Sequence, residues 1–390
     1  MKIVFAYFPF SIKILNMSKI KFGIEAKILS DAPAGIGRYV AELCRNLTDD
    51  PDLSLVIYSP SAFNTELIDK LDNVKLVAGS VKNPVGKQLW LEFVLPFLLK
   101  RDEIDVFWAP AHRMPYFVSS KIPKILTVHD LCWKIAPETM KKTTRLLDSY
   151  KMPVALRKAD IITAPSNSTA EDIARTFGIS KKDVDIIPPA SGLQNVDTDD
   201  SIISKYGLER KKYIVFVGTL EPRKNLKRLL KAYSLLEDSV KNDYKLVIAG
   251  AGGWCGVKLS DIVSQLNLDK NVIITGQLGD GMLASIYANA YFLVFPSLYE
   301  GFGIPIVEAM SFGVPVLTSE VSSMPEVAGD SAIFVDPFDE YPIYKGILEL
   351  IENKMLYEKL AAGAVESASV FSWQKSANKL AHLIKKMINK

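Results

Sequence analysis

Residues 213–225 read YIVFVGTLEPRKN, a short apolar run that ends at a glycine and passes into a polar loop. The run is apolar at nearly every position, as expected of a strand buried on both faces of a parallel sheet. Elsewhere apolar side chains recur at helical spacing, as at Val40, Leu43, Cys44 and Leu47. Strands that alternate with such helices predict a doubly wound α/β sheet.

Similar apolar runs alternate with amphipathic stretches along almost the whole chain. They are residues 20–26, 53–59, 74–78, 104–108, 125–129, 161–164 and 184–188, followed by 213–218, 246–250, 272–276, 292–296, 315–318 and 332–335. Because the pattern occurs twice, we predict an α/β protein with two Rossmann-like, doubly wound parallel-sheet domains. The polar, acid-rich segment 190–212 is predicted to link them. Ligands of such sheets bind at the carboxyl ends of the strands, so the site is expected in a central cleft.

The composition is that of a folded protein, with 390 residues of which 48% are hydrophobic and 23% are charged. The formal charge of +3 is small for this length, so no nucleic-acid partner is expected. Cys44, Cys132 and Cys255 lie far apart without metal-ligand spacing. This argues against a disulfide framework or a zinc site and suits a reducing cytosol.

Residues 1–16 are interpreted as an N-terminal extension. They are apolar and faintly like a signal sequence, but they have no small-residue cleavage site, and Met17 directly precedes the first predicted strand. No uninterrupted apolar run approaches the roughly 18 to 20 residues that span a bilayer. The expected location is therefore the cytoplasm.

Two segments of the first half fall where the cleft is expected. The segment AGIGR contains Gly35 and Gly37 and opens a helix, where backbone N–H groups can approach an anion; a simple tight turn is the alternative. His129 lies at the end of an apolar run and can hydrogen-bond a sugar hydroxyl, with Asp130 orienting its ring. A histidine with a structural role is the alternative there, and His112 is given that interpretation.

The loop GTLEPRKN places Thr219, Arg223 and Lys224 directly after a predicted strand. Two adjacent cations on such a loop can clamp a diphosphate and stabilise it as it leaves. A pair of solvated surface residues is the alternative.

Residues 300–308, EGFGIPIVE, give the strongest signal. Pro305 suits the first turn of a helix and Gly313 suits its end, so the helix is short and its positive end is directed at the cleft. Glu300 in the loop and Glu308 on the helix can bind hydroxyls at different parts of one extended ligand. Burial of Glu308 among apolar residues costs free energy without a partner, which favours a functional role, with a buried ion pair as the alternative.

In combination these segments resemble the retaining glycosyltransferases of family 4, which have the GT-B fold. The match runs from about residue 19 to the C-terminus, in the family's order. It implies that Glu300 and His129 contact the donor sugar at the reacting centre. It also implies a set of donor-binding residues, which are Gly35, Gly37, Thr219, Arg223, Lys224, Phe302, Gly303 and Glu308. Among these, Lys224 would bind the diphosphate, Glu308 the ribose, and Gly37 would let the first domain's loop close.

The resemblance also has consequences for the organisation of the chain. After the extension at 1–16, we expect an acceptor-side domain at 17–195 and a nucleotide-sugar domain at 196–371, and the resemblance implies that a last helix at 372–390 crosses back to the first domain. The family usually has an arginine at the Thr219 position, and Arg223 is the residue that can replace it. No metal and no cofactor are expected.

The expected donor is GDP-mannose, because the GTLEPRKN form is similar to bacterial mannosyl- and rhamnosyltransferases of polysaccharide synthesis; a UDP-sugar is the alternative. The expected acceptor is a glycan or lipid-linked glycan. Residues 90–100 and the basic segment 141–158 are candidates for peripheral contact with the inner membrane surface, with an ordinary solvated helix face as the alternative.

Three other functions compete with this interpretation. A nucleotide-sugar epimerase shares the two-domain fold but is not expected to combine the glutamate pair with the Lys224 loop. A nicotinamide-dependent oxidoreductase needs a third glycine where the first loop has Tyr39, Val40 and Ala41. A sugar-nucleotide sensor without catalysis remains open.

Overall fold

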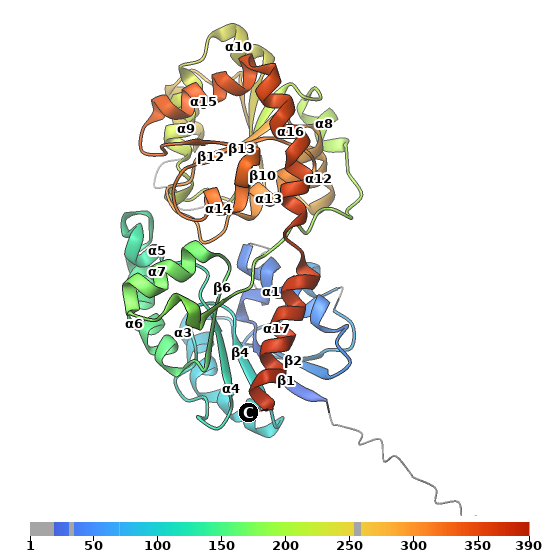
Figure 1. The fold of residues 1–390 in the computed structure, drawn as a ribbon, viewed down its shortest axis with the longest axis vertical. Coiled ribbons are helices and arrows are strands. Elements are labelled where there is room, and N and C mark those ends of the chain that lie inside the picture. Colours follow the sequence, from blue (N-terminus) through green and yellow to red (C-terminus); the bar gives the residue numbers. More distant parts are fainter. Residues whose placement is uncertain (1–18, 31–34, 70, 253–258, 390) are drawn as a thin grey trace, which may run out of the picture.

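The computed structural model describes residues 19–30, 35–69, 71–252 and 259–389. The predicted extension at 1–16 and Cys255 lie outside these ranges. The described chain forms two lobes, each built on a parallel sheet with helices on both faces, so the predicted fold class is confirmed (Figure 1).

The first sheet has seven strands in the order β3-β2-β1-β4-β5-β6-β7. They are β1 (Ile20–Glu25), β2 (Leu53–Ser59), β3 (Lys75–Ala78), β4 (Val106–Ala109), β5 (Lys124–Thr127), β6 (Ile161–Ala164) and β7 (Val184–Ile186). Both faces of the sheet are buried, because Leu55 and Ile57 of β2 pack in one core cluster while Val56 and Tyr58 pack in another. The strand order reverses between β1 and β4, which is the switch point where such sheets bind ligands.

The helices of this lobe connect its strands in sequence order. They are η1 (Lys27–Ser30), α1 (Gly35–Leu47), α2 (Thr65–Ile68), α3 (Pro84–Leu89), the π-helical turn η2 (Trp90–Val94), α4 (Leu95–Arg101), α5 (Cys132–Ile135), η3 (Pro137–Thr139), α6 (Lys142–Lys158), α7 (Asn167–Phe177) and η4 (Lys181–Asp183).

The second sheet has six strands in the order β10-β9-β8-β11-β12-β13, and its switch point lies between β8 and β11. The strands are β8 (Tyr213–Val217), β9 (Lys245–Ala249), β10 (Val272–Gly276), β11 (Phe292–Phe295), β12 (Val316–Ser319) and β13 (Ala332–Val335). The helices are η5 (Pro222–Lys224), α9 (Leu226–Ser234), α10 (Asp238–Asp243), α11 (Leu259–Gln265), α12 (Asp280–Asn289), α13 (Ile304–Ser311), α14 (Met324–Ala328), η6 (Gly329–Ser331), α15 (Glu340–Glu352) and α16 (Lys354–Ser369). All six strands contribute buried side chains to one continuous core.

Two segments join the lobes. The predicted linker 190–212 is not a simple loop, because it contains α8 (Ser201–Tyr206), whose Ile202 is buried in the core of the second lobe. The last helix, α17 (Trp373–Ile388), runs back along the first lobe beside α1 (Figure 1). Its apolar side, with Leu380 and Ile384, is buried in the first lobe's core, and Ser376 donates to the carbonyl oxygen of Pro188 at 2.6 Å.

No helix within the described ranges is both long enough and apolar enough to cross a membrane.

Candidate active site

A cleft of about 400 Å³ lies between the two lobes, at the carboxyl ends of both sheets. All the predicted site residues except Gly37 line it, namely Gly35, His129, Thr219, Arg223, Lys224, Glu300, Phe302, Gly303 and Glu308. Gly37 is buried in α1, and a Cβ there would meet the side chain of Leu67 at an ordinary contact distance. The position of Gly37 therefore supports packing of α1 on α2 and not a contact in the cleft.

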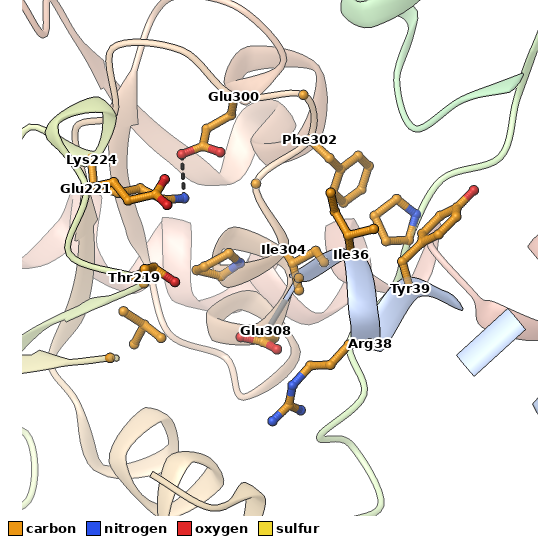
Figure 2. A pocket seen from close by; sticks show the side chains of 18 of the residues that line it. Ile36, Arg38, Tyr39, Thr219, Glu221, Lys224, Glu300, Phe302, Ile304 and Glu308 are labelled. Atoms are coloured by element: carbon orange, nitrogen blue, oxygen red, sulfur yellow. Dashed lines mark hydrogen bonds and ion pairs between the residues drawn. The ribbon is translucent and has the colours of Figure 1, made fainter. Parts of the chain in front are cut away.

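Glu300 holds two cations at one end of the cleft. The Lys224 ammonium donates to its Oε1 at 2.7 Å, and the Arg223 guanidinium pairs with its Oε2. Both cations come from η5, directly after β8, while Glu300 follows β11, the strand beside β8. Adjacent parallel strands thus deliver the three charges to one place, and Figure 2 shows Glu300 directed at Lys224.

The two cations decide the ionisation of Glu300. Burial by itself raises the pKa of this carboxyl, but the attraction of Arg223 and Lys224 outweighs burial and holds the pKa below its ordinary value. Glu300 is therefore an anion at neutral pH, and each of its oxygens is engaged by a cation. Glu300 therefore holds both cations in place, and the phosphates of a ligand can replace Glu300 as their partner.

Glu308 lies farther along the cleft, on α13 (Figure 2). The predicted short helix is confirmed: Pro305 stands in its first turn, and Gly303 at its N-cap has a φ of 104°, which favours glycine. Glu308 is 5% exposed, and its Oε2 accepts the hydroxyl of Tyr287 at 2.9 Å. Burial raises its pKa, partly opposed by the charge of Arg38.

Sequence reasoning did not select Arg38, Tyr287 or Asp280. Arg38 reaches from α1 in the first lobe into the cleft and pairs with Asp280 of the second lobe. Its sequence signal was its place directly after the two glycines of the AGIGR segment. Tyr287 gave no signal, because its contact with Glu308 depends on the packing of α12 against α13.

His129 lines the cleft with a neutral ring. It follows β5, and its ring Nε2 lies 2.7 Å from the carbonyl oxygen of Pro110, so Nε2 carries the proton. Burial lowers the pKa of His129 to about 3, which leaves Nδ1 unprotonated. The prediction that Asp130 orients this ring is wrong, because Asp130 Oδ1 accepts the backbone N–H of Cys132 at 3.0 Å and Pro110 fixes the histidine instead.

The lobes touch at Gly301, next to Glu300. The carbonyl oxygen of Gly301 accepts hydrogen bonds from Ser166 Oγ at 2.7 Å and Thr169 Oγ1 at 3.1 Å. A Cβ on Gly301 would overlap the carbonyl oxygen of His129. Glycine is required here because two backbones from different lobes meet beside the site.

The far wall of the cleft is largely backbone. Gly250 has a φ of 155°, and a Cβ there would overlap the backbone of Gly218, so the loops after β8 and β9 approach closely. Gln277 and Leu278, which follow β10, also line the cleft. Within the described ranges, no group of three or more His, Cys, Asp or Glu residues is placed to hold a metal ion.

Two protein-family models match the chain, one on each lobe. The model described as Glycosyltransferase Family 4 matches residues 33–191, and the model described as Glycosyl transferases group 1 matches residues 198–366.

Similar proteins span nearly the whole chain. O-antigen chain mannosyltransferase B of Escherichia coli is 30% identical over 87% of this chain and 93% of its own length. O-antigen chain mannosyltransferase RfbU of Salmonella typhimurium is 27% identical over 80% of this chain and 86% of its own length. Among solved structures, HepE of Anabaena in complex with UDP and glucose has a TM-score of 0.76 and 18% identity, covering 94% of this chain and 99% of HepE. That likeness bears on the fold.

Proposed function

The chain belongs to glycosyltransferase family 4, and from that premise we propose that it transfers mannose from GDP-mannose to a hydroxyl of a growing, lipid-linked glycan. The proposal includes retention of configuration at the transferred carbon and independence of metal ions. The observation that carries it is a single cleft with two largely buried cations at one end and a buried carboxylate at the other. The choice of mannose rests on the two O-antigen chain mannosyltransferases.

The cation end suits the diphosphate of the donor. Glu300 positions Lys224 and Arg223 side by side, so little reorganisation is needed to bind an anion there. Once the phosphates bind the cations, the Glu300 carboxylate can accept hydroxyls of the donor sugar. The same cations then stabilise the charge that develops on the leaving diphosphate.

The carboxylate end suits the ribose. Tyr287 donates to Oε2 of Glu308, which leaves Oε1 to accept a ribose hydroxyl. Arg38 reaches the cleft from the other lobe, so a bound donor would contact both lobes.

Retention would be governed by the departing diphosphate and the acceptor geometry. In this mechanism Glu300 is a hydroxyl acceptor for the donor sugar once the diphosphate has taken its two cations, and no covalent intermediate forms on it. His129 contributes Nδ1 as an acceptor for a donor-sugar hydroxyl, and its lowered pKa favours this role over that of a general acid.

A lipid-linked acceptor requires a surface that meets the membrane. Exposed rings of the first lobe form an aromatic patch, in which Phe93, Tyr116 and Phe117 are in contact and Phe97 lies one helical turn after Phe93. Their exposed fractions are 60% for Phe93, 65% for Phe97, 57% for Tyr116 and 54% for Phe117. The rings of Phe93 and Phe117 stack at 5.1 Å, and the Lys158 ammonium lies 3.6 Å from the ring centre of Tyr116. Aromatic rings beside a cation suit the boundary between lipid headgroups and acyl chains.

Thermal unfolding in the presence of GDP, UDP, ADP, dTDP or NAD, with and without EDTA, tests the donor assignment. A ligand that binds the folded state raises the melting temperature. We expect a shift with GDP that EDTA does not change and that Glu308→Ala abolishes. A shift with UDP alone would replace the donor, and a shift with NAD alone would overturn the proposal. Transfer from GDP-mannose by the purified chain would exclude a sensor.

A further inference from the structure

A second cavity, of about 200 Å³, opens in the first lobe next to the donor cleft. Ile28 and Ile36 line both cavities and form the wall between them. The second cavity is smaller than the roughly 300 Å³ at the lower end of sites for drug-sized ligands, so it suits a single ring better than a nucleotide. We propose that it binds the terminal sugar ring of the acceptor, with Glu92 and His112 as its hydrogen-bonding residues; this rests on the glycosyltransferase function proposed above.

The cavity lies where this fold binds ligands. Glu25 at the end of β1 and residues 111–115 after β4 line it. These two strands are neighbours at the switch point of the first sheet, where the loops diverge and leave a crevice. The donor site uses the corresponding switch point of the second sheet, so each lobe would hold one substrate at the equivalent place.

Two irregular pieces of backbone converge on this cavity. Glu92 and Leu91 reach it from η2, a single π-helical turn between α3 and α4, and such turns are frequent at functional sites. His112 has a φ of 59°, an unfavourable conformation for a residue with a side chain. Both local backbone conformations are unfavourable in free energy, and together they place the Glu92 carboxylate and the His112 imidazole in the same cavity.

Glu92 is fixed but not saturated. Its Oε1 accepts Lys151 at 2.6 Å and Gln88 at 3.0 Å, and its Oε2 accepts the backbone N–H of Tyr116 at 2.5 Å. A carboxylate offers about four acceptor positions, so one remains on Oε2 for a ligand hydroxyl. The adjacent Phe93 belongs to the exposed aromatic patch, so the same π-helical turn would join the sugar pocket to the membrane-facing surface.

His112 joins the cavity to the donor cleft. Its Nδ1 accepts the backbone N–H of His129 at 3.1 Å, and the two rings lie 5.3 Å apart. Burial lowers the pKa of His112, so the neutral ring carries its proton on Nε2 and can donate to a sugar oxygen. An acceptor ring held by His112 would lie beside His129, on the side of the cleft where the donor sugar is expected.

The charges favour an uncharged ligand over an anion. Lys151 is paired with Glu92, and Arg113 pairs with Asp148 at 2.8 Å. Two of the three cations that line the cavity, Lys151 and Arg113, are therefore engaged, and the apolar wall of Ile28, Ile36 and Leu91 suits the C–H face of a sugar ring.

Ligand-observed NMR on the full chain with saturating GDP tests the proposal. The probes are the methyl glycosides of mannose, glucose, galactose, rhamnose and N-acetylglucosamine, with inorganic phosphate as a competitor. At least one glycoside should receive saturation from the wild type, unaffected by phosphate. Glu92→Gln and His112→Asn should each weaken its binding about tenfold, the cost of a lost hydrogen bond in a desolvated site. His112→Asn tolerates the positive φ and keeps an acceptor for the His129 N–H, so it also serves if Glu92→Gln folds poorly.

Glu103→Gln is the matched control, because it removes an exposed ion pair with Lys21 in the same lobe. Equal binding of the glycosides to wild type and both cavity variants would overturn the proposal, as would displacement by phosphate or no binding of any glycoside. If GDP raises the melting temperature while these results occur, the acceptor pocket alone fails. If no nucleotide raises it, the proposed function fails.

Discussion

At the scale of single residues, Lys224 has two partners: Glu300 in this structure and, on our proposal, the diphosphate of the donor. Lys224→Met should lower kcat/KM by about a hundredfold to a thousandfold, the usual effect of removing one group that stabilises developing charge. The measurement is initial rates with the nucleotide-sugar that the thermal assay selects.

The control for this prediction is Lys231→Met, on the neighbouring α9. Lys231 is 46% exposed at the side chain and makes a 3.6 Å ion pair with Glu340, so its removal should leave kcat/KM unchanged. Equal losses in the two variants, or full activity of Lys224→Met, would contradict the assigned role.

Glu308 gives a pH dependence of stability. Burial raises its pKa above the ordinary value of 4.5, so the folded state binds this proton more tightly than the unfolded state. The stabilisation is fully present below the unfolded pKa and is lost as the pH rises through the raised folded pKa. Relative to Glu308→Gln, the wild type should therefore lose free energy of unfolding as the pH rises from about 4 to about 8.

Urea unfolding of both proteins at each pH measures this difference. Glu320→Gln, an exposed glutamate of the same lobe, is the control and should follow the wild type at every pH. A constant difference between wild type and Glu308→Gln would contradict a raised pKa at this position.

At the scale of elements, the loop after β11 contacts the loop after β5 at Gly301, where a Cβ would overlap the carbonyl oxygen of His129. A methyl group on this residue would force the two backbones apart, and sub-ångström placement of groups from both lobes would be lost. Gly301→Ala should therefore lower kcat/KM by about a hundredfold. Gly279→Ala is the matched control, because a Cβ there meets no atom within 4 Å.

The elements also show how far the sequence alone leads. The apolar run at 213–218 predicted β8, because a strand buried on both faces leaves a continuous apolar signature. Glu300 and the Lys224 loop were predictable since each follows such a strand, and Glu308 was predictable because it lies on the short helix that comes next. The π-helical turn at Glu92 and helix α8 were missed, because both depend on packing against distant segments and leave no periodic pattern.

Other site features were out of reach for the same reason. Arg38 and Asp280 are separated by 242 residues, so their ion pair exists only once the lobes are placed. The protonation of His129 depends on the carbonyl oxygen of Pro110, a contact that the sequence pattern does not encode. The residue types at the site could therefore be predicted from the sequence, but their ion-pair and hydrogen-bond partners and their protonation states could not.

At the scale of the whole molecule, the lobes are joined by several contacts besides the covalent connections. The Glu326 carboxylate of the second lobe accepts the backbone N–H groups of Asn167 and Ser168 at 2.9 and 3.0 Å, at the N-terminus of α7. The Tyr299 hydroxyl donates to Asp172 at 2.8 Å. These contacts lie on the same side as Gly301 and bring the cation end of the donor cleft against the first lobe.

The aromatic patch gives the molecule an orientation, because it and the acceptor cavity are on the first lobe while the cation end of the donor site is on the second. A chain that works on a lipid-linked glycan would lay this patch on the bilayer.

The double variant Phe93→Ser, Phe97→Ser should therefore bind vesicles of phosphatidylethanolamine and phosphatidylglycerol at least tenfold more weakly, since each buried ring contributes roughly 1.5 to 3 kcal/mol. Co-sedimentation measures the binding. Met355→Ser, an 83% exposed side chain of the other lobe, should bind like the wild type. An unchanged GDP-induced rise in melting temperature would show that the double variant keeps its donor site. If the double variant binds vesicles as well as the wild type does, the membrane contact lies elsewhere. The patch would then be an ordinary group of exposed apolar side chains.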